Sequence, residues 1–393
     1  MRAGDRVRVI ARLVQAEPER QLWAETYERR LSDVLALQSE LAQAIAHEIE
    51  ITVTPEEKVA LGRSRPVDPD AYLLYSKGRY FWNQRTKEAF EGALKYFNQA
   101  IEKDPTFALA HAGVAYTYVL LGHEIYSLMD PHKSYPLAKA AAEEALEYDE
   151  TLAEAHVVLA AVLQGHDWNL AAAEREYERA IALNPNYATA HQWYSHCLLP
   201  MGRQEDSLAH SKRALELDPL SLILKLHLGW HYLYTGEHDL AIEQLKETLE
   251  LNSNFIVAIL FLGQVYEQEG RLEEAIEMFE KGVGLSERNP VHLAALAHAY
   301  AVSGRITAAN EILGEMIDLS GQRYVPSYEV AVIYAGLDQQ GQALDWLWRA
   351  YEQRDSSWLV EVALDPRFKR LRSEPRFQDL TRRLGLPEFE AVP

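Results

Sequence analysis

Five consecutive segments of 34 residues, beginning at Ala188, Leu222, Ile256, Pro290 and Tyr324, can be aligned without a gap. When each first residue is counted as position 1, positions 8 and 20 hold small residues in every segment, and position 11 holds leucine or tyrosine. Position 15 is glycine in four segments and aspartate in the fifth. A fixed period of this length is typical of stacked supersecondary units, so one short motif must recur five times.

Each segment contains two apolar stripes with the spacing of α-helices. Positions 4, 7, 8 and 11 form one stripe, and positions 20, 24 and 27 form the other, with position 15 between them. Glycine at position 15 is expected to end the first helix. Small residues at positions 8 and 20 let two antiparallel helices approach closely. One such pair cannot bury its stripes alone, so neighbouring pairs must stack into an all-α solenoid.

The small-aromatic-small signature at positions 8, 11 and 20 resembles the tetratricopeptide repeat (TPR) family. The unit at Ala188 departs from the signature with Ser195, Ser207 and Ser211, and only Pro219 keeps the family's proline at position 32. The resemblance implies an all-α, right-handed superhelical solenoid of about eight helix-turn-helix repeats. It also implies a concave groove in which peptides or partner proteins bind.

Three less regular units precede the strict ones and complete a predicted array over residues 71–357. The second of them contains an insertion of about eleven residues around HEIYSLMDPHKSYP, which we expect to protrude from the array. The predicted units lie near residues 71–107, 108–152, 153–187, 188–221, 222–255, 256–289, 290–323 and 324–357.

The first 51 residues follow a different pattern. Alternating apolar residues at 6–14 and a second short run at 21–27 predict a β-hairpin, and the apolar spacing over 34–49 predicts a helix. This stretch resembles the end of a TolB-like α/β domain that precedes TPR arrays in bacterial signalling proteins. The resemblance implies that residues 1–51 are a remnant of such a domain, joined by a proline-rich linker at 52–70. It also implies an upstream cyclase, kinase or winged-helix output domain, so we interpret the chain as a fragment or a shortened homologue.

Residues 358–393 leave the 34-residue period and are expected to form capping helices. The motif DPRF recurs nine residues later as EPRF, and each copy places an acidic residue and a proline at a helix start. Phe377, Leu380 and Leu384 then form an apolar stripe. The stripe predicts a terminal helix that covers the last repeat.

Composition narrows the possible partners. A formal net charge of -20 and a pI of about 5.2 argue against direct nucleic-acid binding, because phosphate recognition needs clustered Lys and Arg. Cys197 is the single cysteine, so no disulfide can form within the chain. Arginines interrupt the N-terminal apolar residues, and no apolar stretch reaches the ~20 residues of a membrane span. We therefore expect a soluble, cytoplasmic protein without a membrane partner.

No sequence motif for catalysis, cofactor binding or metal binding is found. A phosphate-binding loop, a G-x-S-x-G elbow and an EF-hand loop are absent. His47 and His123 each precede a glutamate, yet no second histidine follows at the spacing of a zinc-protease helix. His227 and His231 lie one helical turn apart without a further ligand spaced to complete a tetrahedral site. The sequence therefore predicts no enzyme, no cofactor and no metal site.

The remaining candidate is a binding surface. The first helix of each unit carries a second stripe at positions 2, 5, 9 and 12, and stacking aligns these positions along the concave face. Trp230 and Tyr234 would be the anchors of a mixed aromatic and polar strip, although Trp230 could equally pack against its neighbours. The predicted partner-binding residues are Gln192, His196, Leu226, Trp230, Tyr234, Gln264, Glu267, His298 and Tyr328.

Two functional hypotheses follow. The leading one is a non-enzymatic scaffold, regulatory in bacterial signalling, that binds a peptide or partner protein in the concave groove. The alternative is a ligand-sensing regulatory segment of a cyclase, kinase or transcriptional regulator whose output domain is absent here. An enzyme working in the groove would need convergent titratable groups, and the sequence gives no sign of them.

Overall fold

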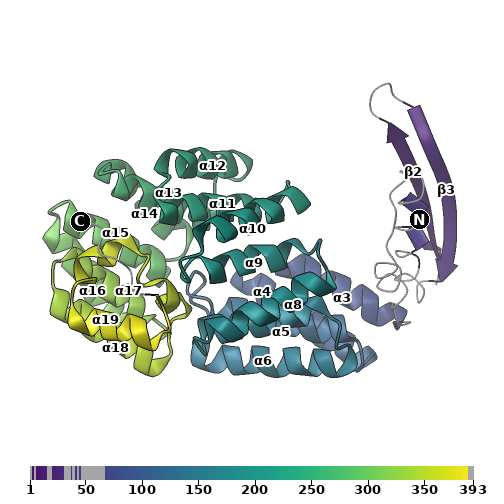
Figure 1. The fold of residues 1–393 in the computed structure, drawn as a ribbon, viewed down its shortest axis with the longest axis horizontal. Helices are drawn as coiled ribbons and strands as arrows, with labels where there is room; N and C mark the ends of the chain where they lie inside the picture. The colour runs from purple at the N-terminus through teal and green to yellow at the C-terminus, as the bar shows by residue number, and fades with distance from the viewer. Residues whose placement is uncertain are drawn as a thin grey trace.

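The computed structural model describes residues 2–3, 6–15, 20–30, 37, 40–41, 44–45 and 67–387. From Pro69 onward the chain forms eight helical hairpins followed by short C-terminal helices (Figure 1). The paired helices are α3 Pro69–Trp82 with α4 Lys87–Lys103, α5 Ala108–Gly122 with α6 Pro131–Tyr148, α7 Ala153–Gly165 with α8 Leu170–Leu183, α9 Ala188–Leu198 with α10 Gln204–Leu217, α11 Leu222–Thr235 with α12 His238–Leu251, α13 Ile256–Gln268 with α14 Leu272–Leu285, α15 Pro290–Val302 with α16 Ile306–Ser320, and α17 Ser327–Gly336 with α18 Gln340–Gln353. The predicted all-α solenoid is confirmed.

The turn inside each strict repeat uses a left-handed backbone at position 15. Gly202, Gly236, Gly270 and Gly304 have φ values between 70° and 83°, and Asp338 has a φ of 58°. Glycine adopts this conformation without steric conflict, whereas an L side chain is strained in it. The recurring glycine is therefore explained by the turn that reverses the chain between two helices.

Position 8 lies under the side chain of position 24. A Cβ atom added to Gly229 would lie 2.8 Å from Leu245, and one added to Gly263 would lie 2.5 Å from Phe279. In the α9–α10 pair, positions 8 and 20 are the serines Ser195 and Ser207. The hydroxyl of Ser207 donates to the carbonyl of Ser195 at 2.8 Å. The serines that departed from the repeat signature are thus buried and satisfied by hydrogen bonds.

The insertion between α5 and α6 turns inward, so the predicted protrusion is wrong. The side chain of Ile125 is only 5% exposed, and that of Glu124 is fully buried. The side-chain amide of Asn289, at the start of α15, donates to the carbonyls of Ile125 and Tyr126 at 3.3 and 2.9 Å. Apolar side chains in the insertion explain the inward path, because burying them is favourable. The insertion thereby joins the second hairpin to the seventh.

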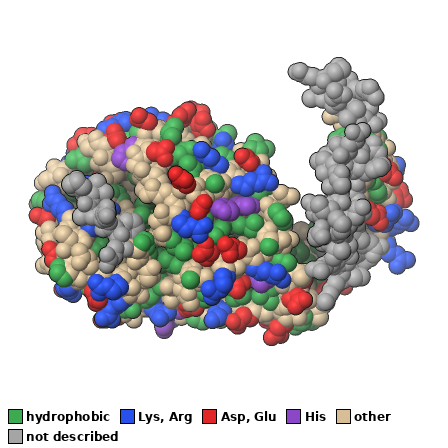
Figure 2. Space-filling view, in the orientation of Figure 1, with side chains coloured by type: hydrophobic (Ala, Val, Ile, Leu, Met, Phe, Trp, Pro, Cys, Tyr) green, Lys and Arg blue, Asp and Glu red, His purple; other side chains and the backbone are tan. Residues whose placement is uncertain are grey.

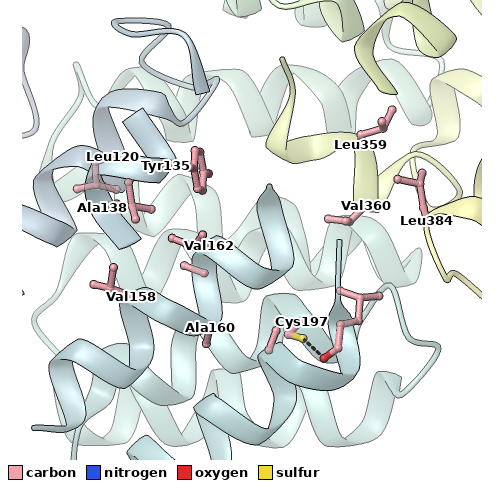
Figure 3. Packing of buried hydrophobic residues seen from close by; sticks show 14 of the residues in the cluster. Leu120, Tyr135, Ala138, Val158, Ala160, Val162, Cys197, Leu359, Val360 and Leu384 are labelled. Atoms are coloured by element: carbon pink, nitrogen blue, oxygen red, sulfur yellow. Dashed lines mark hydrogen bonds between the residues drawn. The ribbon is translucent and has the colours of Figure 1, made fainter. Parts of the chain in front are cut away.

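The C-terminal residues fold back against early repeats. They form the short helices η2 Ser357–Glu361, η3 Pro366–Leu371 and α19 Pro375–Arg383. The predicted terminal stripe is buried, and Leu359, Val360 and Leu384 belong to one apolar cluster with Val162 and Cys197 (Figure 3). This cluster brings the two ends of the solenoid into contact.

The N-terminal strands form the predicted hairpin. Strand β2 (Arg6–Gln15) pairs antiparallel with β3 (Arg20–Arg30), and the short β1 (Arg2–Ala3) lies beside β2. Most of the predicted helix at 34–49 and of the linker at 52–70 lies outside the described residues, although residues 37, 40, 41, 44 and 45 are helical. Across the described part of the chain, every helix is too short or too polar to cross a bilayer.

Candidate functional site

Stacking of the first helices brings the predicted groove residues into line. His196 on α9 lies against Trp230 on α11, with 3.9 Å between ring centroids, and Trp230 lies 5.1 Å from Tyr234. Farther along, the imidazole of His298 on α15 is 2.9 Å from the carboxylate of Glu267 on α13. Residues at position 9 of α9 and α11 therefore contact each other, and position 9 of α15 contacts position 12 of α13.

Most of these residues are buried, so the expectation of an open strip needs correction. Trp230 and Tyr328 are 2% and 1% exposed, whereas His196 and Tyr234 are partly exposed. The other buried members are Gln192, Leu226, Gln264, Glu267 and His298. Other segments of the same chain cover the strip, and the helical period alone could not reveal that cover. The role of these residues in partner binding stays a prediction.

The cover consists of the α5–α6 insertion and helix η2. The carboxylate of Glu124 accepts a hydrogen bond from the hydroxyl of Ser357 and another, at 3.1 Å, from the backbone N–H of Trp358. The guanidinium of Arg354, just before η2, donates to the carbonyl of His166 at 2.9 Å. These contacts hold η2 on the inner face of the solenoid, between the early repeats and the last one.

A cavity of about 140 Å³ remains beneath this cover. Its walls are mostly aromatic and aliphatic, with a few polar groups among them. The lining includes Arg85, His123, Tyr126, Gln164, Gln192, Trp193, His196, Leu226, His227, Trp230, Phe261, Ser357, Trp358 and Glu361. Four of the nine predicted groove residues, Gln192, His196, Leu226 and Trp230, therefore line the cavity. The other five, Tyr234, Gln264, Glu267, His298 and Tyr328, lie outside its lining.

Burial keeps the histidines of the cavity in their neutral form. Desolvation lowers the pKa of His196 to about 3, and it also lowers the pKa values of His123 and His227. The Nε2 atom of His196 lies 2.5 Å from the Nδ1 atom of His227, so one of the two rings donates to the other. A neutral pair can share one hydrogen bond in this way, whereas two buried imidazolium ions would repel each other.

Glu361 also lines the cavity, and the pKa of its carboxyl group is shifted in the opposite direction from the pKa values of the histidines. Desolvation raises the pKa of its carboxyl group to about 8, so the group keeps its proton at neutral pH. The Nδ1 atom of His196 is 3.9 Å from a carboxyl oxygen of Glu361. The cavity therefore offers neutral donors and acceptors at this end.

The described residues contain no group of three or more His, Cys, Asp or Glu side chains arranged to hold a metal ion. His227 and His231, considered above as a metal pair, contact different partners. His227 pairs with His196, and the Nδ1 atom of His231 is 3.1 Å from the hydroxyl of Ser207. The geometry suits recognition by hydrogen bonds and stacking rather than metal coordination.

A second buried polar group lies next to the cavity. Asp365 forms an ion pair with Arg367 at 2.7 Å and accepts a hydrogen bond from Tyr328 at 2.7 Å. The carboxyl group of Glu329 has no hydrogen-bond partner within the described chain, and desolvation raises its pKa to about 8. The acidic residue of the DPRF motif therefore starts η3 as predicted and also pairs with a buried arginine.

Sequence reasoning missed the residues that close the cavity. Glu124 follows His123 in a pair that matched no metal motif, yet it anchors η2. One available signal was the apolar content of the insertion, where Ile125, Leu128 and Met129 are unusual for a solvent-exposed loop. Helix η2 gave no comparable signal, because its partner Glu124 is 233 residues away.

On the outer surface, acidic and basic side chains are interspersed, and no continuous basic patch covers the face seen in Figure 2. Several exposed ion pairs join neighbouring repeats, for example Arg305 with Glu273 at 2.6 Å. Such pairs contribute little to stability individually. The visible face offers no extended cationic surface for phosphate groups, in line with the net charge.

Comparison with known proteins gives a match to one repeat family and partial matches to two named proteins. Residues 257–289 match the family model described as tetratricopeptide repeat. A Rhizobium meliloti (strain 1021) protein named "Putative adenylate cyclase 3" is 30% identical over 162 residues, which is 41% of this chain and 27% of that protein. The Mus musculus protein O-mannosyl-transferase TMTC3 is 28% identical over 175 residues, or 43% of this chain and 18% of that protein. The chain thus spans about a quarter or less of the length of these relatives.

Solved structures share the fold. The APC/C hetero-tetramer Cut9-Hcn1 matches with a TM-score of 0.54 and 18% identity, over 79% of this chain and 55% of that chain. A monomeric mutant of IFIT1 with Gppp-AAAA matches with a TM-score of 0.52 and 16% identity, over 89% of this chain and 81% of that chain. At these identities the likeness concerns the backbone arrangement alone.

Proposed function

Because the chain is a tetratricopeptide repeat protein, we propose that it is a protein-interaction scaffold that catalyses no reaction of its own. The repeat fold supports the role of a scaffold. We further propose where on this scaffold a partner binds. A short partner segment binds on the inner face, at the place that η2 occupies in the closed chain. Helix η2 then acts as an internal competitor that regulates access.

The single observation behind this proposal is that the inner face already holds a peptide segment. Glu124 accepts from both Ser357 and Trp358, and the ring of Trp358 lies 6.0 Å from that of His123. Leu359 is fully buried beside them. A partner with the same chemistry would carry a hydroxyl residue, then a large aromatic residue, then aliphatic residues. The predicted strip, including Trp230, would form the floor of this site.

A synthetic peptide with the sequence DSSWLVEVAL, residues 355–364, tests the proposal. The full chain carrying Ser357→Asp places a second carboxylate beside buried Glu124, which should release η2 by charge repulsion. We expect the labelled peptide to bind this variant at least about tenfold more tightly than the unaltered chain, because the internal competitor is displaced. Fluorescence anisotropy measures both affinities.

Two controls make the result decisive. Tyr80→Ala, at a residue that is 67% exposed on α3, should bind the peptide like the unaltered chain. Circular dichroism must show that Ser357→Asp keeps its helical content. A folded Ser357→Asp chain that binds the peptide no better than the unaltered chain would contradict internal competition.

The cellular setting belongs to the same proposal. The repeats lie in the cytoplasm and serve bacterial signalling, an assignment supported by the local similarity to a Rhizobium meliloti protein whose name refers to adenylate cyclase. The cavity under η2 favours a second function, in which the chain is the ligand-sensing segment of a regulator with a separate output domain. Sequencing the complete gene separates the two, because an in-frame output domain supports the second function.

A further inference from the structure

The cavity under η2 has the size of a small ligand. Its volume is about 140 Å³, close to the ~150 Å³ cavity that holds benzene in an engineered protein. One aromatic ring with a single polar substituent would fill it. Trp193, Trp230 and Trp358 contribute to its walls, so a flat ring could stack against indole faces.

Two polar side chains in the wall are available to a ligand. Gln192 and Glu361 both line the cavity, and the carboxyl group of Glu361 lies 3.9 Å from the Nδ1 atom of His196. Gln192 is 6% exposed and Glu361 is 7% exposed. Buried polar groups in folded proteins are nearly always paired with protein, ordered water or ligand. Both groups line the cavity, so a molecule inside it could satisfy them.

The charges around the cavity favour a neutral occupant. The three wall histidines are uncharged at neutral pH, as described above, and the protonated carboxyl group of Glu361 can both donate and accept. Arg85 is the cationic group in the wall, and its guanidinium already lies 3.8 Å from the centre of the Trp82 ring. A cation would face Arg85 across the same small space, and an anion would lose its hydration to walls that are mostly apolar.

We propose that this cavity binds a small, planar, uncharged ring compound that carries an amide-like donor and acceptor. Gln192 and Glu361 hydrogen-bond its polar group, and the tryptophans stack on its ring. Binding closes η2 more firmly, because Glu361 and Trp358 belong to η2 and would both contact the ligand. This inference deepens the ligand-sensing function and does not depend on partner docking.

Three molecules of nearly equal shape and different charge test the proposal. Benzamide is neutral, benzoate is an anion and benzamidinium is a cation, and all three are added to the full chain at pH 7. We expect benzamide to quench the tryptophan fluorescence saturably and to bind at least tenfold more tightly than either ion. Tighter binding of benzoate or of benzamidinium would overturn the proposed chemistry.

Substitutions locate the site. Gln192→Leu removes the amide at similar volume and should weaken benzamide binding at least tenfold. The control is Thr248→Val, at a buried residue of α12 that does not line the cavity, and it should bind benzamide unchanged. Equal binding to both variants, or no saturable binding to the folded unaltered chain, would overturn the site. The peptide experiment measures a different binding event. If the peptide does not bind, the result of the benzamide experiment is unaffected.

Discussion

Asp338 occupies the turn position that glycine holds in the other strict repeats, with the same left-handed backbone. The reversal of the chain between α17 and α18 requires this left-handed conformation whichever residue occupies the position. Aspartate tolerates this region better than most residues with a Cβ atom, although it is still less favourable than glycine. Such positions show how a single dihedral angle produces a repeating glycine in the sequence.

A pair of glycine substitutions tests this explanation. Gly270→Ala should reduce the free energy of unfolding by about 1 kcal/mol or more, because its φ is 70°. Gly314→Ala should raise it by about 0.5–1 kcal/mol, because this glycine lies inside α16 and an added Cβ would meet no neighbour within 4 Å. Urea unfolding measures both changes. Equal effects of the two substitutions would rule out the turn as the reason for the glycine.

At the scale of the elements, each helical pair is held by small residues beneath larger ones. Gly229 and Gly263 lie under Leu245 and Phe279, so the two helices of each pair approach closely. Ala241, at position 20 of the fifth pair, is fully buried in the same contact layer. Close approach leaves no room for additional side-chain volume, and proteins respond to added volume in a packed core with strain.

Ala241→Trp therefore should destabilise the solenoid by roughly 1–3 kcal/mol or more, because the indole must displace its neighbours. The control is Leu240→Trp at the preceding residue, whose side chain is 42% exposed and can accept the indole at the surface. The thermal unfolding midpoint compares the two variants. An unchanged midpoint for Ala241→Trp would contradict the assigned packing of α11 against α12.

At the scale of the molecule, the last repeat and the helix η2 that follows it contain buried carboxyl groups. Desolvation raises the pKa values of Glu329 and Glu361 to about 8 and that of Asp355 to about 7. Asp355 accepts a hydrogen bond from the hydroxyl of Ser327 at 2.5 Å, and Glu361 lies in the cavity wall. These groups are neutral when the closed chain is most stable.

The closed chain should lose stability as the pH rises from about 7.2 to 8. Folding raises the pKa values of these carboxyl groups, so the folded state binds more protons and each ionisation costs about 1.4 kcal/mol per pH unit. At lower pH the histidines oppose this trend, because burial lowers their pKa values, for example that of His292 to about 4, whereas the unfolded chain still binds protons at these rings near pH 6.5. Above about pH 7.2 most of these rings are neutral in both states, so the carboxyl effect is the larger one.

Unfolding midpoints at pH 7.2, 7.6 and 8 provide the measurement. Glu329→Gln should flatten the dependence, because the amide cannot ionise, whereas Glu277→Gln on the exposed side of α14 should leave it unchanged. A midpoint that rises over this range would show that the buried carboxyl groups are ionised in the folded chain.

The repeat period by itself determined the helices, their pairing and their turns. Those features depend on contacts within one unit or between adjacent units. The structural roles of residues such as Gly236 and Ala241 can therefore be predicted from the sequence of their own unit. The alignment of His196 with Trp230 along the inner face was likewise predictable, because equal repeat lengths bring equal positions together.

Only the tertiary structure decided that the inner face is covered and that a cavity forms under the cover. Glu124 meets Ser357 across 233 residues, and Asn289 contacts Tyr126 across 163 residues of an array that periodicity treats as independent units. No local pattern encodes such contacts, because they arise from the accumulated curvature of many stacked pairs. The helices follow from nearest-neighbour packing, and the cavity follows from where the curvature brings distant repeats together.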